Sequence, residues 1–117
     1  MKAVIILNDP PYGTERSYNG LRLAQALRKN APDGGVTVFL MAHAVLCAKA
    51  GQKTPEGFYN IEKMLHRVIG GGGRVLLCGT CMDARGLTEG ELVEGAGRST
   101  MDALAAATIE ADKVVVF

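Results

Sequence analysis

Two cysteines, Cys78 and Cys81, lie two residues apart in this chain of 117 residues. They follow the apolar run Arg74–Leu77, which predicts a buried strand, and precede Met82–Gly86, which predicts a turn or a short helix. A pair of thiols at the end of a strand is suited to sulfur or redox chemistry. The two sulfur atoms are therefore candidates for a functional site.

The surroundings of the two thiols favour a nucleophilic role. The thiolate is the reactive form of cysteine, and backbone N–H groups of the following turn, together with Arg85, would favour it. Asp83 would oppose it by adding negative charge nearby. Three chemistries are compatible with this arrangement: a persulfide carrier, a thioredoxin-like dithiol, or half of a metal site.

The alternative to these three functional roles is a structural one, in which Cys78 is simply a small apolar residue that ends a strand. We favour a functional role because both thiols stand at the end of a predicted strand. A structural zinc site needs four ligands, and only Cys47, His43 and His66 remain to complete one, so we expect no metal and no cofactor. A thioredoxin-like motif opens a long helix, whereas Gly86 interrupts this segment.

Two further segments are candidates for binding. The loop that contains Tyr12, Gly13 and Thr14 leads into a predicted helix, where an anion could bind, or it could be a rigid turn beside the thiols. It has neither the Lys of a P-loop nor the glycine spacing of a dinucleotide site. His43 could act as a base or as a cation beside a thiol, or it could be an ordinary surface histidine.

Composition limits the classes of function. Hydrophobic residues make up 48% and charged residues 21% of the chain, which is typical of one globular domain over residues 1–117. The net charge is +1, no basic run is present and aromatic residues are only 5%, so we expect no nucleic-acid partner. No segment approaches the roughly 18 apolar residues of a membrane span, and the first apolar stretch predicts a strand, not a signal peptide. We therefore expect a cytoplasmic protein without membrane contact.

Hydrophobic periodicity predicts alternating strands and helices. The expected strands are Val4–Asn8, Val36–Met41, Arg74–Leu77, a very short one at Leu92-Val93, and Lys113–Phe117. The expected helices run from a cap at Thr14 or Ser17 to about Asn30, over His43–Ala50, over Phe58–Ile69, and onward from a cap at Ser99.

The same patterns predict which side chains of the helices face inward. In the first helix they are Leu21, Leu23, Ala24, Ala26 and Leu27. In the central helix they are Ile61, Met64, Leu65, Val68 and Ile69, and in the last helix they are Met101, Leu104, Ala105 and Thr108. The short apolar segment His43–Ala50 either contacts another chain or folds over its own sheet.

This alternation predicts a single three-layer α/β/α domain with a mostly parallel sheet of about five strands, covered on both faces. Ligands of such sheets bind outside the carboxyl ends of the strands. The segments after the first three strands, Asn8–Thr14, Met41–His43 and Cys78–Arg85, should therefore meet at one edge.

Four motifs, in order along the chain, resemble those of a known family. They are Pro11-Tyr12-Gly13-Thr14-Glu15, Gly57-Phe58-Tyr59-Asn60-Ile61, Leu77–Gly86, and the ending Ala111–Phe117. With this total length, they make the chain similar to the DsrE/DsrF-like sulfur-relay family, and to its YchN-like branch in particular.

The resemblance implies a three-layer α/β fold, assembly into homotrimers or homohexamers, and a role in intracellular sulfur transfer with donor and acceptor proteins. It implies that Cys78 occupies the position of the cysteine that carries a persulfide in relay members. Cys81 matches a second cysteine found in the YchN-like branch.

The leading hypothesis from the sequence is a small sulfur carrier. Cys78 would carry the persulfide, Cys81 would resolve or shuttle it, and Arg85 would stabilise the anion. The first alternative is a non-catalytic redox sensor or binding subunit that uses a Cys78–Cys81 disulfide. The second alternative is a binder of small anions or nucleotides at the loop from Tyr12 to Thr14.

Overall fold

The protein is built around one parallel β-sheet. In the computed structural model, which describes residues 1–117, five strands lie in the order β4-β3-β2-β1-β5, and every neighbouring pair is parallel. The strands are β1 (Lys2–Leu7), β2 (Gly35–Leu40), β3 (Arg74–Cys78), β4 (Ala96–Ser99) and β5 (Lys113–Val116). The predicted α/β fold with a parallel five-stranded sheet is therefore confirmed.

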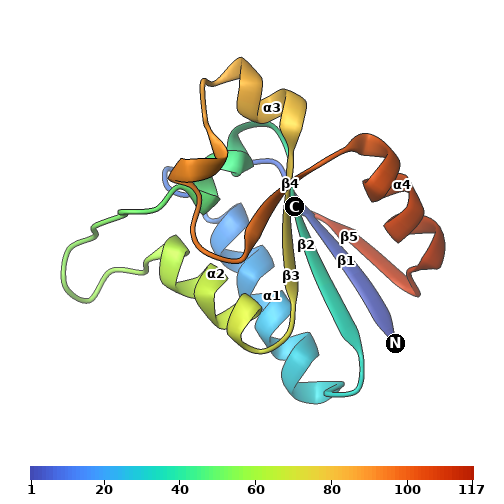
Figure 1. The fold of residues 1–117 in the computed structure, drawn as a ribbon. Helices are drawn as coiled ribbons and strands as arrows, with labels where there is room; N and C mark the ends of the chain where they lie inside the picture. The colour runs from blue at the N-terminus through green and yellow to red at the C-terminus, as the bar shows by residue number, and fades with distance from the viewer.

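Helices cover the two faces of the sheet unequally. The α-helices are α1 (Arg16–Asn30), α2 (Ile61–Gly70), α3 (Gly79–Ala84) and α4 (Met101–Glu110), and two short 3-10 helices are η1 (Ala42–Ala48) and η2 (Glu89–Glu91). Figure 1 shows α1 and α2 side by side on one face and α4 alone on the other. The same view shows α3 beyond the carboxyl ends of the strands. None of the helices combines the length and the apolar character needed to cross a membrane.

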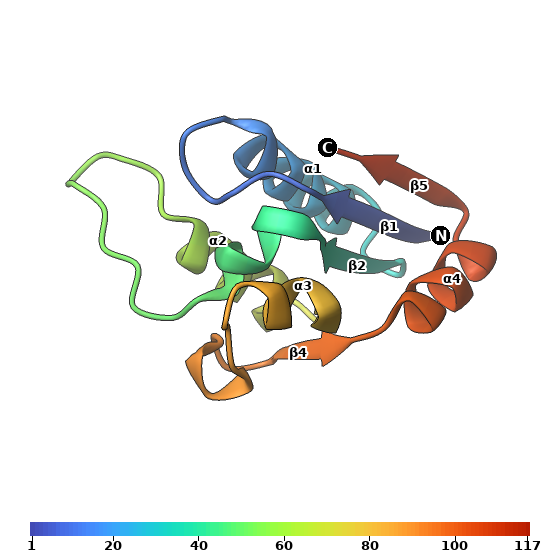
Figure 2. The same cartoon turned by 90° about the horizontal axis from the view of Figure 1, so that it is seen from above.

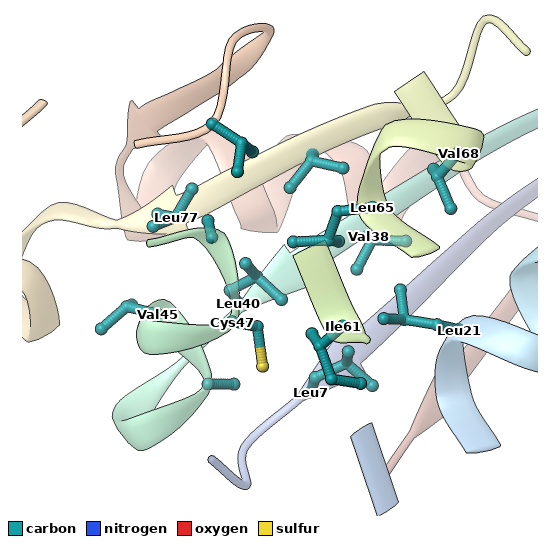
Figure 3. Close-up of a cluster of buried hydrophobic side chains, with 14 of the residues drawn as sticks. Leu7, Leu21, Val38, Leu40, Val45, Cys47, Ile61, Leu65, Val68 and Leu77 are labelled. Atoms are coloured by element: carbon teal, nitrogen blue, oxygen red, sulfur yellow. The ribbon is translucent and has the colours of Figure 1, made fainter. Parts of the chain in front are cut away.

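The main core lies between the sheet and the α1–α2 face. Twenty buried residues form it, and Figure 3 shows 14 buried side chains of this kind, which come together from strands and helices. Ile61, Leu65 and Val68 of α2 are fully buried, as their helical spacing predicts. The face under α4 holds only four buried residues: Val4, Phe39, Cys78 and Leu104. Cys78 thus lies on the thinly covered side of the sheet.

The apolar segment after β2 folds over its own sheet. The short helix predicted over His43–Ala50 is the 3-10 helix η1, which begins at Ala42 and ends at Ala48. Ala44, Val45, Cys47 and Ala48 are buried in the main core. Its low polarity is therefore explained within the chain, without a second subunit.

Several predicted boundaries are wrong. The central helix begins at Ile61, not Phe58, because the side chain of Asn60 caps it by accepting the Lys63 N–H. Leu92-Val93 is not a strand: Leu92 makes one isolated antiparallel bridge to Lys49, and β4 forms instead at Ala96–Ser99.

The last helix also differs from the prediction. Thr100, not Ser99, caps α4 by accepting the Ala103 N–H, because Ser99 still belongs to β4. Of its four residues predicted to face inward, only Leu104 is buried. Met101 is 58% exposed, and Ala105 and Thr108 are also exposed, because α4 packs on the sheet without a neighbouring helix. Ala26 of α1, predicted to face inward, is likewise exposed.

We predict that Leu65→Ala lowers the free energy of unfolding by about 2–5 kcal/mol, because it leaves a cavity between α2 and the sheet. Lys63→Ala, an exposed position on the same helix, is the matched control and should change stability by about 0.5 kcal/mol or less. Denaturant unfolding measures both. Equal effects of the two variants would contradict this description of the core.

Candidate functional site

Cys78 stands where β3 becomes α3. It is the last residue of the strand and the N-cap of the helix, and its Sγ accepts a hydrogen bond from the Cys81 N–H at 3.4 Å. The residue is 8% exposed. The turn therefore directs a backbone donor at the Cys78 sulfur, which is an arrangement suited to stabilising negative charge on it.

Cys81 is held from a different direction. Its Sγ accepts the N–H of Ala42 at 3.2 Å. Ala42 has a φ of 51°, and it is the one residue other than glycine with a positive φ. Such a conformation costs energy and tends to occur at functional sites. The start of η1 thus adopts a strained backbone where it meets this thiol.

The two sulfur atoms differ in their electrostatic surroundings. Burial raises the pKa of the Cys81 thiol, the neighbouring Cys78 raises it further, and the Ala42 N–H and Arg85 only partly offset this. The thiolate form of Cys81 is therefore disfavoured. This makes it a weaker nucleophile than an ordinary exposed cysteine.

Arg85 connects the end of α3 to η1. Its Nη1 donates to the Cys81 carbonyl oxygen at 3.0 Å, and its Nε donates to Nδ1 of His43 at 3.2 Å. Both predicted residues thus lie beside Cys81, where they fix the backbone that bears it.

Asp83 forms a two-pronged ion pair with Arg98 of β4. The Arg98 Nη1 and Nη2 donate to the two Asp83 carboxylate oxygens at 2.7 and 2.8 Å. This pairing lowers the pKa of the Asp83 carboxyl and raises that of the Arg98 guanidinium. Because the folded-state pKa of Asp83 is lowered, the pair is complete at neutral pH and is lost only as the pH falls through that value.

A small cavity lies beside Cys78. Its volume is about 420 Å³, and its lining comes from two short stretches, Cys78–Cys81 and Arg98–Met101. Figure 2 shows β4 leading toward α4. The guanidinium of Arg98 lies against Gly79, since a Cβ at that position would come within 2.8 Å of it. Gly79 therefore leaves the space that lets Arg98 approach the cysteine turn.

Sequence reasoning missed the second half of this cavity. Arg98, Ser99, Thr100 and Met101 were not among the candidate residues, although Ser99 lies directly opposite Cys78 in the β3–β4 ladder. Correct placement of β4 would have revealed them, because parallel neighbours end at the same edge. β4 is too short and too poor in apolar residues for its sequence to predict a strand.

The loop from Tyr12 to Thr14, predicted as a binding site, makes structural contacts away from the cysteines. The Tyr12 hydroxyl donates to Gln52 Oε1 at 2.7 Å and accepts the Ile61 N–H at 3.1 Å, so it joins this loop to the start of α2. Thr14 donates to the Asp9 carboxylate, and Gly13 adopts a φ of 104°. Neither these residues nor His43 line the cysteine cavity.

The remaining soft ligands are dispersed. Cys47 is buried in the main core, where burial raises the pKa of its thiol to about 12. His66 lies 3.6 Å from Glu62 on the exposed side of α2. No group of three or more His, Cys, Asp or Glu side chains could hold a metal ion. All three cysteines are free thiols.

The sequence and the fold both have known relatives. The model of the DsrE/DsrF-like family matches residues 1–117. The chain belongs to the DsrE/DsrF-like family. Among its members, the chain is 43% identical to protein YchN of Escherichia coli strain K12, over 99% of this chain and 98% of that protein. It is 39% identical to the uncharacterized protein MJ0989 of Methanocaldococcus jannaschii, over the full length of both.

Solved structures agree with this assignment. The crystal structure of the E. coli ychN protein superposes with a TM-score of 0.95 and covers 100% of this chain and 99% of that one. The structure of MTH1491, a protein of unknown function from Methanobacterium thermoautotrophicum, has a TM-score of 0.74 at 16% identity and covers 99% of this chain and 98% of that one, which supports the fold alone. The family resemblance predicted from the four motifs is therefore confirmed.

We predict that Cys47 resists alkylation in the folded protein. In a variant that carries Cys78→Ser and Cys81→Ser, iodoacetamide at pH 8 should leave Cys47 unmodified until denaturant is added, because the thiol is buried and its pKa is about 12. Mass spectrometry counts the adducts. Rapid modification of Cys47 without denaturant would contradict the placement of η1 in the core.

Proposed function

We propose that this DsrE/DsrF-like protein is a sulfur carrier that accepts a sulfane sulfur on Cys78 as a persulfide and passes it to an acceptor thiol. The observation that carries the proposal is the position of the Cys78 sulfur, which receives a backbone N–H and borders a cavity lined by a guanidinium. Family membership supports the class of function. Such chemistry belongs in the cytoplasm, where thiols are kept reduced.

The sulfur transfer proceeds without an external oxidant or reductant. The Cys78 thiolate attacks the outer sulfur of a donor persulfide, R–S–SH, so that a new S–S bond forms on Cys78 as the donor S–S bond breaks. The donor leaves as the thiolate R–S⁻, and Cys78 holds S–SH. Delivery is the same exchange with an acceptor thiolate as the attacking group.

Arg98 is better placed than Arg85 to stabilise the carried sulfur. Arg98 lines the cavity together with Cys78 and is held there by its ion pair with Asp83. Arg85 does not line the cavity, and its guanidinium is bound to the Cys81 carbonyl and to His43. The persulfide extends the side chain by one sulfur into the space that Arg98 borders. Arg85 and His43 hold the Cys81 turn in place.

Cys81 stands as an auxiliary thiol in this proposal. If Cys81 attacked the inner sulfur of the Cys78 persulfide, the products would be a Cys78–Cys81 disulfide and HS⁻, and a reductant would be needed to restore the thiols. The raised pKa of Cys81 disfavours this attack at neutral pH. The competing function, a redox sensor that switches through this disulfide, is favoured by the placement of both thiols on one turn.

Loading can be measured by intact-protein mass spectrometry. After incubation with a low-molecular-weight persulfide and removal of excess donor, the wild-type protein and the Cys81→Ser variant should gain the mass of one sulfur atom. The Cys78→Ser variant should gain none. Cys47→Ser, which changes the buried thiol alone, is the matched control and should load like the wild type.

Two outcomes would overturn the carrier. If the Cys78→Ser variant gained sulfur on Cys81 at the wild-type level, Cys78 would not be the residue that carries the persulfide. Loss of two hydrogen masses in the wild type, with no sulfur gained, would indicate a Cys78–Cys81 disulfide and favour the redox sensor.

We further propose that the chain assembles into a homotrimer or homohexamer through the α4–β5 side. Met101 and Ile109 of α4 are 58% and 84% exposed, and Val114 and Val116 of the edge strand β5 are 41% and 63% exposed. An open apolar edge strand invites pairing unless another chain covers it. A second copy of this chain is the occupant that family membership favours.

Light scattering after size-exclusion chromatography tests the assembly. The expected mass is three or six times the 12.4 kDa of one chain. Ile109→Lys should shift the protein to a smaller species because it places a charge in the apolar contact. Ala50→Lys changes an exposed residue outside α4 and β5 and should leave the mass unchanged. A monomer at high micromolar concentration would refute the proposal.

A further inference from the structure

The largest cavity of the molecule lies away from the cysteines. It has a volume of about 890 Å³ and lies between α1, α2 and the segment that precedes α2. Small-molecule sites span roughly 300–1,000 Å³, so the space is large enough for a nucleotide-sized ligand. Figure 1 shows α1 and α2 side by side, with the chain before α2 extending outward from the start of α2.

The walls of this cavity carry a concentration of positive charge. Arg22 and Lys29 of α1 face it from one side, and Lys63 and Arg67 of α2 from the other, against a single carboxylate, Glu56. The whole chain has a net charge of only +1. The charge is therefore gathered here rather than spread evenly, and clefts lined by one sign of charge attract the opposite sign.

None of these four cations is neutralised within the chain. The five salt bridges involve other residues: Lys2, Arg16, Lys49, His66 and Arg98. Arg22 instead donates to the Asn19 side chain and lies 5.6 Å from the ring centre of Tyr18. The cationic groups are thus free to bind an anion from outside the chain.

Aromatic rings line the end of the cavity nearest the start of α2. Phe58 stacks on Tyr59 with ring centres 4.5 Å apart, and Tyr59 packs on Tyr18 of α1 at 4.4 Å. Phe58 is nevertheless 52% exposed. The stack holds an aromatic ring in place with a free surface, and aromatic rings of this kind bind nucleobases by stacking.

The cavity is fixed at both ends by contacts between its walls. At one end, the Tyr18–Tyr59 stack joins α1 to the chain before α2. At the other, the Arg28 guanidinium of α1 donates to the carbonyl oxygens of Gly71 and Arg67. The site therefore exists before any ligand binds, which reduces the cost of ordering it on binding.

We propose that this cavity binds a nucleoside polyphosphate, with the base on Phe58 and the phosphates among the four cations. The aromatic group and the cations lie in one cavity, and this ligand class carries both complementary groups. The site is distinct from the cysteine cavity, with which it shares no lining residue. If the cavity binds no nucleotide, the proposal that Cys78 carries sulfur is unaffected.

Isothermal titration of the wild-type protein with ATP, adenosine and inorganic tripolyphosphate separates the two parts of the site. ATP should bind with a sub-millimolar Kd, and each of the other two compounds should bind about tenfold or more weakly, since each lacks one group. The ATP affinity should fall as salt is added, because the phosphate contacts are exposed and screened.

Variants assign the residues. Phe58→Ala should weaken ATP binding about tenfold and leave tripolyphosphate binding unchanged, because it removes a stacking surface alone. Arg67→Gln should weaken both. Arg74→Gln is the matched control: it removes the same charge from an exposed residue of β3 that lines a different cavity, and it should change neither.

Three results would overturn the proposal. The first is no ATP binding at millimolar concentration. The second is tripolyphosphate binding as tightly as ATP, which would leave a simple anion surface without a base site. The third is an equal loss of ATP affinity in Arg67→Gln and Arg74→Gln, which would show that the loss follows from the net charge of the protein and not from a contact in the cavity. Unfolding curves for each variant confirm that it is folded.

Discussion

The parallel pairing of β4 with β3 is the contact on which the candidate site depends. The ladder places Ser99 opposite Cys78 and Leu77 opposite Arg98, so the chain leaves both strands at the same edge. Arg98 then reaches over Gly79 to the Asp83 carboxylate. Without this register, Cys78 would end a strand on a thinly covered face of the sheet and would have no cavity beside it.

The two thiols of one turn acquire different properties from different neighbours. Cys78 receives a hydrogen bond from within its own turn, whereas Cys81 receives one from Ala42, whose backbone is strained. Burial raises the pKa of Cys81. A C-x-x-C motif therefore need not be a symmetric dithiol. Here both cysteines line the cavity, but Arg85, itself bound to His43, holds the backbone carbonyl of Cys81 alone.

The sequence predicted what local patterns determine. The helical spacing of Ile61, Leu65 and Val68 led to the right face of α2, and the apolar runs led to three central strands. It failed where long-range contacts decide. Ala96–Ser99 has no strand pattern of its own and becomes β4 by pairing with β3, so Arg98 could not be assigned to the site. Met101 appeared inward by periodicity, but α4 has no helical neighbour to cover it.

The central claim is that Cys78 carries sulfur and hands it on intact. A single-turnover chase tests it: protein loaded with isotopically labelled sulfur is mixed with excess acceptor thiol, and the label is followed by mass spectrometry. We expect the label to appear as an acceptor persulfide, at the same rate in the wild type and in Cys81→Ser, with all protein thiols recovered. Release of the label as sulfide, with a Cys78–Cys81 disulfide left on the wild-type protein, would contradict it.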